Sequence, residues 1–503
     1  MPEKRRRVEA ATLKGFQDLF PEDLIHRKAA IRAIEKVFEL YGFIPLETPA
    51  LEYLEVLLGA GGEATNKELF RLDSPEGEAI ALRFDLTVPF ARLLAQYPDR
   101  LKPPVRRYAI GPVWRADKPG PGRFRQFTQF DVDVAGAETV AADAEIIAIM
   151  GAVMDAVGAP DYRVLVNNRK LIDALLTGCG IEEPARQKHV LRVIDKLQKV
   201  GPANIRLELG PGRIDDSGDP IPGVGLDAQT IDRVISFVGL QRDTRAGVVE
   251  ALHGALPAGP ATDEALAEMA ELAAALDALG IPEAHAQFDP SLARGLDYYT
   301  GPVFETIIPS APQFGSVMGG GRYNQLVERF LDQPIPCTGM SVGLDRLMAA
   351  LAHLGVSKPS KTTVQVLVVT LGKGIPRAET LKVASELRAA GIATEAYLGK
   401  KAKMGDQLSH ADRAGIPVAV ILGEDEIARG EVSIKDLHAG KAQREGIEDR
   451  DEYRKSGKVS QVTVPRADMA TQVRAFLGAG AHRPEGANYD SPGQRPGDRI
   501  PGE

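Results

Sequence analysis

Residues 105–136 read VRRYAIGPVWRADKPGPGRFRQFTQFDVDVAG and carry the strongest structural signal in the chain. Apolar and polar residues alternate on both sides of the turn KPGPG at 118–122. Alternation with a period of two indicates strands, and glycine and proline between two such runs indicate a hairpin. The segments 105–115 and 124–136 are therefore predicted to form a long antiparallel hairpin with a basic-rimmed tip.

The second strand of this hairpin has one polar face. A period of two places Arg125, Gln129, Asp131 and Asp133 on that face and aromatic and branched apolar residues on the other. A solvated outer face and the floor of a polar pocket both fit the pattern. From the pattern alone we expect the solvated face, with the pocket floor as the alternative.

The segments on either side of the hairpin alternate between helical and strand patterns. Apolar residues recur at helical spacing in 22–41, and 79–85 alternates like a strand. The Ala- and Leu-rich segment 169–287 predicts a helical insertion. Strand character returns at 303–308 and 338–342, and a helix is predicted directly after the last of these strands.

A linker, SKPSKTT at 357–363, precedes a second alternating region. Strands alternate there with helices of about 10–15 residues, which is typical of a separate α/β domain. The tail at 480–503 is polar and rich in Pro and Gly, so it is expected to be disordered.

Composition excludes several classes of protein. The 61 basic and 69 acidic side chains give a net charge of −8, so binding to a polyanion would need a local basic patch. The only cysteines, Cys179 and Cys337, form no CxxC pair, and the sequence has no metal-ligand cluster. No secretory signal and no apolar run long enough for a membrane span are present. We therefore expect a soluble cytoplasmic protein without a resident metal.

Three further segments combine arginine with glycine or tyrosine. RGLDYY (294–299) offers an anion contact with aromatic hydroxyls, GGGRY (319–323) allows a ligand to approach the backbone, and GLDR (343–346) opens a helix. Guanidinium groups suit phosphates. These features favour a nucleotide-phosphate site on an antiparallel sheet and an ATP-using enzyme. The glycine run at 319–321 matches neither the GxGxxG nor the Walker A pattern, so it predicts neither a Rossmann nor a P-loop site.

Over about residues 10–475 the chain resembles the histidyl-tRNA synthetases, a family of class II aminoacyl-tRNA synthetases. Three class-wide motifs occur in order, and they read GFIPLETPALE (42–52), VWRADKPGPGRFRQFTQFD (113–131) and GMSVGLDRLMAAL (339–351). Segments similar to the family's own signatures read RGLDYYTGPVFE (294–305), GGGRYNQLVERF (319–330) and LRFDLTVPFAR (82–92).

The resemblance implies an α+β fold with a class II antiparallel-sheet catalytic core and a C-terminal α/β anticodon-binding domain. The implied domains are a catalytic core at 1–168 and 288–356, a helical insertion at 169–287, an anticodon-binding domain at 363–478 and a tail at 480–503.

The resemblance also assigns roles to four arginines. Arg115 matches the arginine that grips the α-phosphate of ATP, and Arg294 matches the family's own arginine on the other side of that phosphate. Arg294 also touches the histidine carboxylate in this implied arrangement. Arg346 matches the arginine that stacks on adenine, and Arg123 resembles a second phosphate contact. Arg115 and Arg294 are thus the implied catalytic residues.

The remaining implied site residues bind histidine. Asp85, Thr87 and Gln129 resemble the residues around the substrate's α-amino group and carboxylate end. The imidazole pocket is implied to contain Asp133, Tyr298, Tyr299 and Tyr323. Many bacterial relatives carry glutamate at the positions of Asp85 and Asp133, so packing or water must compensate for the shorter side chains. The role of Asp117 in contacting adenine or tRNA stays open.

The implied enzyme is a histidine–tRNA ligase. It activates L-histidine with ATP, releases pyrophosphate and transfers histidine to the 3′ end of tRNA(His), with Mg²⁺ delivered on ATP. The first motif implies a homodimer, and Lys400, Lys401 and Lys403 are candidate tRNA-phosphate contacts. The alternative is a regulatory, histidine-sensing subunit of ATP phosphoribosyltransferase, which resembles the core but lacks the anticodon domain.

Overall fold

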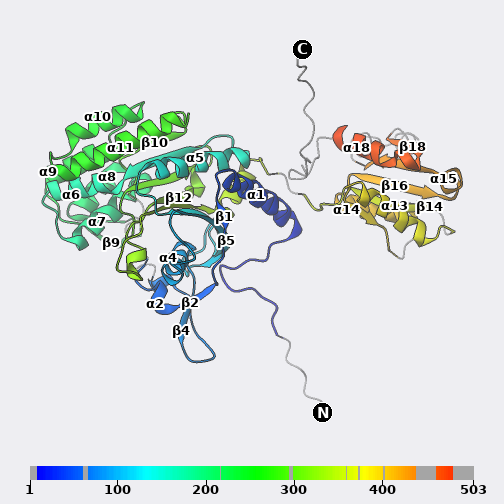
Figure 1. Ribbon diagram of the computed structural model, residues 1–503, viewed down its shortest axis with the longest axis horizontal. Coiled ribbons are helices and arrows are strands. Elements are labelled where there is room, and N and C mark those ends of the chain that lie inside the picture. The colour runs from blue at the N-terminus through cyan, green and yellow to red at the C-terminus, as the bar shows by residue number, and fades with distance from the viewer. Residues whose placement is uncertain are drawn as a thin grey trace. The chain divides into compact units, whose positions relative to one another are not determined.

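The chain forms two units, and a large mixed sheet lies at the centre of the first. The computed structural model describes residues 8–60, 66–215, 217–293, 298–357, 360–371, 374–399, 403–437 and 460–479. The chain divides into a unit of residues 1–18 and 33–357 and a unit of residues 19–32 and 358–503, drawn in Figure 1.

The predicted hairpin forms the middle of the large sheet. Its strands are β5 (Val105–Trp114) and β6 (Gln126–Ala135), which pair antiparallel over their whole length. The turn between them closes with a bridge from Gly120 to Arg123. The hairpin prediction is confirmed.

Six further strands extend this sheet to eight, in the order β1-β5-β6-β13-β12-β11-β7-β10. Pairing is antiparallel from β5 to β7 and parallel at the two edges. The added strands are β1 (Ile44–Pro45), β7 (Arg163–Asn168), β10 (Ala286–Phe288), β11 (Pro302–Ile307), β12 (Ser316–Arg322) and β13 (Cys337–Gly343). The strands expected at 303–308 and 338–342 are confirmed as β11 and β13.

A smaller sheet, β2-β4-β3, and several helices complete the first unit, to which α1 contributes only its residues 33–40. The strand expected at 79–85 ends at Leu82, because the chain turns there toward α4. The elements concerned are α1 (Pro21–Leu40), β2 (Leu51–Tyr53), α2 (Leu54–Leu57), β3 (Arg71–Asp73), β4 (Ala79–Leu82), α4 (Thr87–Gln96), α5 (Ala141–Ala156), η1 (Pro312–Phe314), η2 (Val327–Arg329) and α12 (Leu344–His353).

The segment between β7 and β10 is mainly helical, as predicted, and its helices lie together at one end of the unit in Figure 1. Arg245 is buried there and donates to backbone oxygens of Ile281 and Ala286. The elements are α6 (Arg169–Gly178), α7 (Pro184–Ile194), α8 (Leu197–Leu209), β8 (Gly212–Ile214), β9 (Pro220–Pro222), α9 (Ala228–Val238), α10 (Arg245–Ala255) and α11 (Pro260–Ala278).

The second unit contains the predicted alternation of strands and helices. Its five-stranded sheet has the order β15-β14-β16-β17-β18, parallel among the first three strands and antiparallel beyond them. The elements are β14 (Val366–Leu371), α13 (Arg377–Ala389), β15 (Thr394–Ala396), α14 (Met404–Ala414), β16 (Val418–Gly423), α15 (Glu424–Arg429), β17 (Glu431–Asp436), β18 (Gln461–Pro465), η3 (Arg466–Asp468) and α18 (Met469–Ala479).

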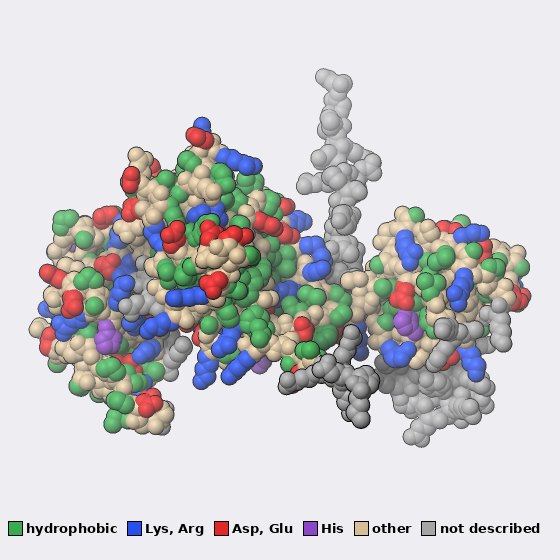
Figure 2. Space-filling model, turned by 90° about the horizontal axis from the view of Figure 1, so that it is seen from below, with side chains coloured by type: hydrophobic (Ala, Val, Ile, Leu, Met, Phe, Trp, Pro, Cys, Tyr) green, Lys and Arg blue, Asp and Glu red, His purple; other side chains and the backbone are tan. Residues whose placement is uncertain are grey.

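The surface carries both signs of charge. On the face drawn in Figure 2, basic and acidic side chains are interspersed. No helix among the described residues is both long enough and apolar enough to cross a membrane. The predicted tail at 480–503 lies outside the described residues.

Candidate active site

The expectation that the polar face of β6 is solvated is wrong. Asp131 and Asp133 are only 1% and 2% exposed, and Gln129 is 8% exposed. These side chains are therefore covered, and Gln129 lines a cavity, which agrees with the alternative interpretation of a polar pocket floor. The alternation predicted which residues share the face but not which face is covered.

Residues with small side chains lie opposite Gln129 and Asp131 on the neighbouring strands and leave space above the sheet. We call Gln129, Asp131 and Asp133 the polar strip. Residues opposite each other on paired strands point to the same face. Asp131 lies between Ala109 of β5 and Ser341 of β13, and Gln129 lies between Gly111 and Gly343.

Glycine is required in this floor at Gly339 of β13. A Cβ atom there would lie 2.1 Å from Asp133 Oδ1. Gly321 of β12 is similarly constrained, because its Cβ would lie 3.0 Å from Tyr299 Cδ1. Gly339, and Gly321 within the glycine run singled out in the sequence, therefore leave room for the side chains of Asp133 and Tyr299.

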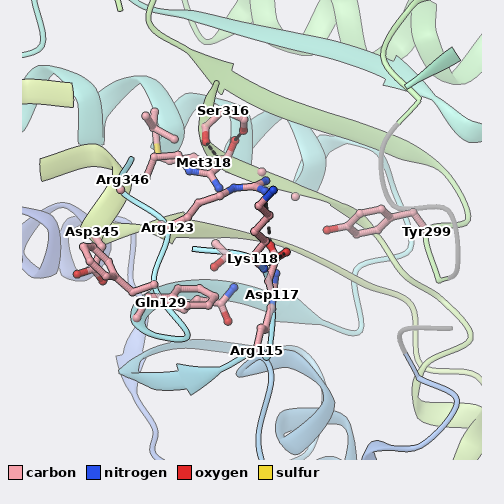
Figure 3. Close-up of a pocket in the computed structure, with 18 of the residues that line it drawn as sticks. Arg115, Asp117, Lys118, Arg123, Gln129, Tyr299, Ser316, Met318, Asp345 and Arg346 are labelled. Carbon is pink, nitrogen blue, oxygen red and sulfur yellow. Dashed lines mark hydrogen bonds and ion pairs between the residues drawn. The ribbon is translucent and has the colours of Figure 1, made fainter. Parts of the chain in front are cut away.

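A cavity of about 330 Å³ opens over this floor. Figure 3 shows Tyr299 reaching toward it from the side opposite Asp345 and Arg346. The residues that line the cavity come from the hairpin turn, β6, the segment before β11, β12, β13 and the start of α12. They are Arg115, Asp117, Lys118, Gly122, Arg123, Phe124, Phe127, Gln129, Tyr298, Tyr299, Ser316, Val317, Met318, Gly319, Gly320, Ser341, Gly343, Asp345 and Arg346.

The three described arginines predicted for ATP all line this cavity. Arg115 is held by a bond from its Nε to Phe84 O at 3.0 Å and lies over the Phe127 ring. Arg346 donates from Nη1 to Ser316 O at 2.7 Å. Arg123, in the hairpin turn, is half exposed and lies 3.5 Å from Asp117. Two anchored guanidinium groups and one half-exposed one thus surround a space suited to an anionic ligand.

A buried ion pair with a tyrosine forms one end of the polar strip. Arg107 Nη2 lies 2.7 Å from Asp133 Oδ2, and both side chains are almost completely buried. The Tyr323 hydroxyl donates to Asp133 Oδ1 at 2.5 Å. Burial raises the pKa of Asp133, while Arg107 and the bond from Tyr323 oppose that rise.

Two more buried carboxyl groups lie near this pair. Burial raises the pKa of Asp85 to about 6, against a backbone bond from Val88 N at 3.1 Å and the charge of Arg115. Burial also raises the pKa of Asp131 to about 7, against the charge of Arg107. The Thr87 hydroxyl is 3.4 Å from Asp131 Oδ2. Three clustered acids with perturbed pKa values are typical of a functional site.

Three tyrosines, Tyr298, Tyr299 and Tyr323, pack against one another in this region. The rings of Tyr298 and Tyr299 are 4.6 Å apart, and Tyr298 meets the Tyr323 ring edge-on at 6.2 Å. Desolvation raises the pKa of the Tyr298 hydroxyl well above its usual value, with Tyr299 adding to the effect. The hydroxyl therefore stays protonated at neutral pH and can donate a hydrogen bond.

The predicted site residues that the structure describes are brought together in one region, while Arg294 lies outside the described residues. The cavity is lined by Arg115, Arg123, Gln129, Tyr298, Tyr299 and Arg346. Asp85, Asp133 and Tyr323 are buried, and the half-buried Thr87 contacts Asp131.

Two members of this region are not predicted by the sequence patterns, and a third is predicted without a role. Arg107 and Ser341 were not singled out, and Asp131 was placed on the polar face only. The register Arg107↔Asp133 and Ser341↔Asp131 carries the missing information. An arginine inside an apolar strand was the one sequence signal that could have identified Arg107.

The carboxylates of Asp117 and Asp345, which line the cavity, already contact other residues of the protein. Asp345 Oδ2 accepts from Thr128 N at 2.7 Å, and Asp117 contacts Arg123. Among the described residues no group of three or more His, Cys, Asp or Glu side chains could hold a metal ion.

Comparison with known proteins identifies the family. The histidyl-tRNA synthetase family profile matches residues 15–347, and an anticodon-binding domain profile matches residues 365–474. A histidine–tRNA ligase of Paracoccus denitrificans is 42% identical over 493 residues, covering 94% of this chain and 99% of that protein. A histidine–tRNA ligase of Caulobacter vibrioides is 41% identical over 485 residues, covering 94% and 97%.

A solved structure agrees with this result. Histidyl-tRNA synthetase from Nostoc sp. superposes with a TM-score of 0.78 at 32% identity, covering 94% of this chain and all of that one. A Bacillus halodurans protein described as an ATP phosphoribosyltransferase regulatory subunit/histidyl-tRNA synthetase has a TM-score of 0.65 at 25% identity, covering 80% and 97%. On the strength of the family profile and the relatives aligned over nearly the whole chain, this protein belongs to the histidyl-tRNA synthetase family.

Proposed function

We propose that the protein is a histidine–tRNA ligase that works through histidyl-adenylate. One observation carries the proposal most strongly. Buried Asp133, held by Arg107 and Tyr323, lies on the same face of β6 as Gln129, which lines a cavity together with Arg115 and Arg346. We assign the surroundings of Asp133 as the imidazole slot, and the cavity suits a nucleotide phosphate.

In the first step the histidine carboxylate attacks the α-phosphorus of ATP and pyrophosphate leaves. In this assignment Arg115 binds the α-phosphate, and the fixing of its guanidinium group by Phe84 O and the Phe127 ring supports that role. Fixed cations act most strongly on charge that develops in a water-poor site. By family resemblance Arg294 binds the same phosphate and the carboxylate. Arg346 and Arg123 bind the outer part of ATP, and Mg²⁺ arrives bound to its phosphates.

Histidine recognition rests on Asp133, Tyr323 and the tyrosines at 298 and 299. An imidazole carries two ring nitrogens, and a carboxylate together with a hydroxyl can bond both. Buried polar groups left without their partner are costly, so amino acids lacking these nitrogens are rejected. In this assignment Asp85, Thr87 and Gln129 hold the α-amino group and the carboxylate end.

In the second step the terminal ribose of tRNA(His) takes the histidyl group. The hairpin turn with Lys118 and Arg123 borders the cavity and is half exposed, which suits contact with the acceptor end. The anticodon-binding profile supports a role for 363–478 in reading the tRNA. Lys403 stays a candidate phosphate contact, whereas Lys400 and Lys401 lie outside the described residues.

The proposed domains are the core at 1–168 and 288–356, the insertion at 169–287 and the anticodon-binding domain. The first motif supports a homodimer, because Ile44, Leu51 and Tyr53 expose 59%, 46% and 52% of their surface. Exposed apolar residues gathered on short strands favour association with a second subunit. A cytoplasmic location follows from the need for ATP and tRNA.

The test is ATP–pyrophosphate exchange by the full chain with each of the twenty amino acids in turn. Only L-histidine should support exchange, with other amino acids lower by about 10⁴-fold, because the slot is built from buried hydrogen-bonding groups. Aminoacylation of tRNA(His) is then measured with the same preparation. No exchange with histidine would refute the proposal.

The same experiment separates the ligase from the regulatory subunit of ATP phosphoribosyltransferase. A regulatory subunit would bind histidine without exchanging pyrophosphate. The anticodon-binding profile at 365–474 and the three described ATP arginines in one cavity favour the ligase.

A further inference from the structure

A strip of buried oxygen atoms lies between the imidazole slot and the phosphate cavity. Gln129, Asp131 and Asp133 are successive residues on one face of β6. Gln129 lines the cavity and Asp133 is bonded to Tyr323. Asp131 therefore occupies the middle of the floor, about 7 Å from each neighbour along the strand. A bound histidine that reaches from the slot to the cavity must pass over it.

Two buried oxygen atoms at this central position, Gln129 Oε1 and Asp131 Oδ1, have no hydrogen-bond partner among the described residues. The Ser341 hydroxyl is also buried and bonds to the Asp131 carboxyl group, and its oxygen can accept a further hydrogen bond. Buried oxygens without a partner cost free energy, so two adjacent ones point to a ligand that donates hydrogen bonds.

The required ligand group is a compact cation with several N–H donors. Each of the three atoms can accept a hydrogen bond, and Asp131 adds negative charge when ionised. A primary ammonium group offers three donors and one positive charge. The α-ammonium group of an amino acid is the part of the substrate located between its side chain and its carboxylate.

We propose that Asp131 is a specificity-determining residue whose carboxylate, with Gln129 Oε1 and Ser341 Oγ, accepts the hydrogen bonds of the substrate's α-ammonium group. This inference rests on the proposed histidine ligase activity. It also explains how the site tolerates the short side chain of Asp85. One oxygen of Asp85 is used by Val88 N, and Asp131 supplies a second carboxylate within electrostatic reach.

The test compares L-histidine with imidazolepropionate, which has the same ring and carboxylate but no amino group. Wild-type exchange with histidine is established first, and its absence would refute the proposed function rather than the role of Asp131. In Asp131→Asn the KM for histidine should rise about 10–100-fold, because a charged hydrogen-bond partner is lost. The Ki of imidazolepropionate, measured as a competitive inhibitor, should change less than about twofold.

Asp143→Asn serves as the matched control, since Asp143 is a buried carboxylate bonded to Arg322 and Thr338 instead. Asp143→Asn should leave the ratio of the KM for histidine to the Ki of imidazolepropionate unchanged. If Asp131→Asn does not fold, Ser341→Ala replaces it, with a selective loss for histidine of about threefold. Equal losses for both ligands, or no loss for either, in the folded variant would overturn the proposal.

Discussion

Two buried arginine–aspartate pairs in the same unit differ in how completely their atoms are bonded. Asp143 accepts from Thr338 Oγ1 at 2.7 Å and from Arg322 Nε at 3.0 Å, and Arg322 also donates to the carbonyl groups of residues 137 and 139. In the other pair, Arg107 with Asp133, the Arg107 Nε has no hydrogen-bond partner among the described residues. Burial is nearly equal in the two pairs.

The difference separates structure from binding. A fully bonded pair stabilises one packing of the fold, and loss of either partner leaves a buried charge uncompensated. An incompletely bonded pair is costly to the empty protein and gains partners when a polar ligand arrives. We therefore expect variants of the first pair to affect folding and variants of the second to affect histidine binding.

The largest effect is expected from Asp143→Asn. This change breaks the fully bonded pair and should lower the free energy of unfolding by about 3–5 kcal/mol. Denaturant unfolding followed by circular dichroism measures the loss. The KM for histidine of the folded fraction should stay within about twofold of wild type, and a tenfold change would place Asp143 in the binding machinery.

A smaller effect, on binding, is expected from Asp133→Asn. The KM for histidine should rise about 10–100-fold with little change in the KM for ATP, because a charged hydrogen-bond acceptor for the imidazole is lost. Stability should fall less than in Asp143→Asn, since Asp131 and Asp85 still face Arg107. Equal losses for histidine and ATP in the exchange assay would contradict an imidazole contact.

The hydroxyl donors of the two pairs give a finer comparison. Tyr323→Phe removes one hydrogen bond to Asp133, so the KM for histidine should rise about 3–10-fold. Thr338→Val removes the corresponding bond to Asp143 and should leave that KM unchanged while lowering stability. The opposite pattern, with Thr338→Val impaired in histidine binding, would reverse the assignment of the pairs.

The smallest expected effect is a gain in stability from Asp131→Asn without ligand. The folded-state pKa of Asp131 is raised to about 7, so the folded form binds more protons than the unfolded form between roughly pH 4 and pH 7. The free energy of unfolding therefore falls as pH rises through this window. Asparagine does not ionise, so Asp131→Asn removes this decrease. The melting temperature should exceed that of wild type by about 2 °C at pH 8 and less at pH 5. If Asp131→Asn melts below wild type at pH 8, the main effect of the Asp131 charge is to compensate the charge of Arg107.

The fold followed from the sequence where local patterns determine it. The hairpin at 105–136 and the alternation after residue 363 are periodic, so their elements were predicted correctly. The strand expected at 79–85 stops at Leu82 because Asp85 bonds Val88 N and the chain turns into α4, which apolar alternation alone does not reveal.

The site was predicted largely by resemblance, and what that missed depends on tertiary structure. Alternation grouped Asp131 with Asp133 but could not show that this face is covered. Arg107 was overlooked because its importance comes from the register that places it opposite Asp133. Ser341 carries no motif signal by itself, and only the pairing of β6 with β13 brings it to Asp131.

The most direct test of the contrast between the two pairs is the melting temperature of Asp133→Asn and Asp143→Asn with and without saturating L-histidine. We expect Asp143→Asn to melt well below wild type but keep the full increase on adding histidine. Asp133→Asn should start closer to wild type and lose most of that increase, since ligand stabilisation follows affinity. An undiminished increase in Asp133→Asn would contradict a histidine site at Asp133.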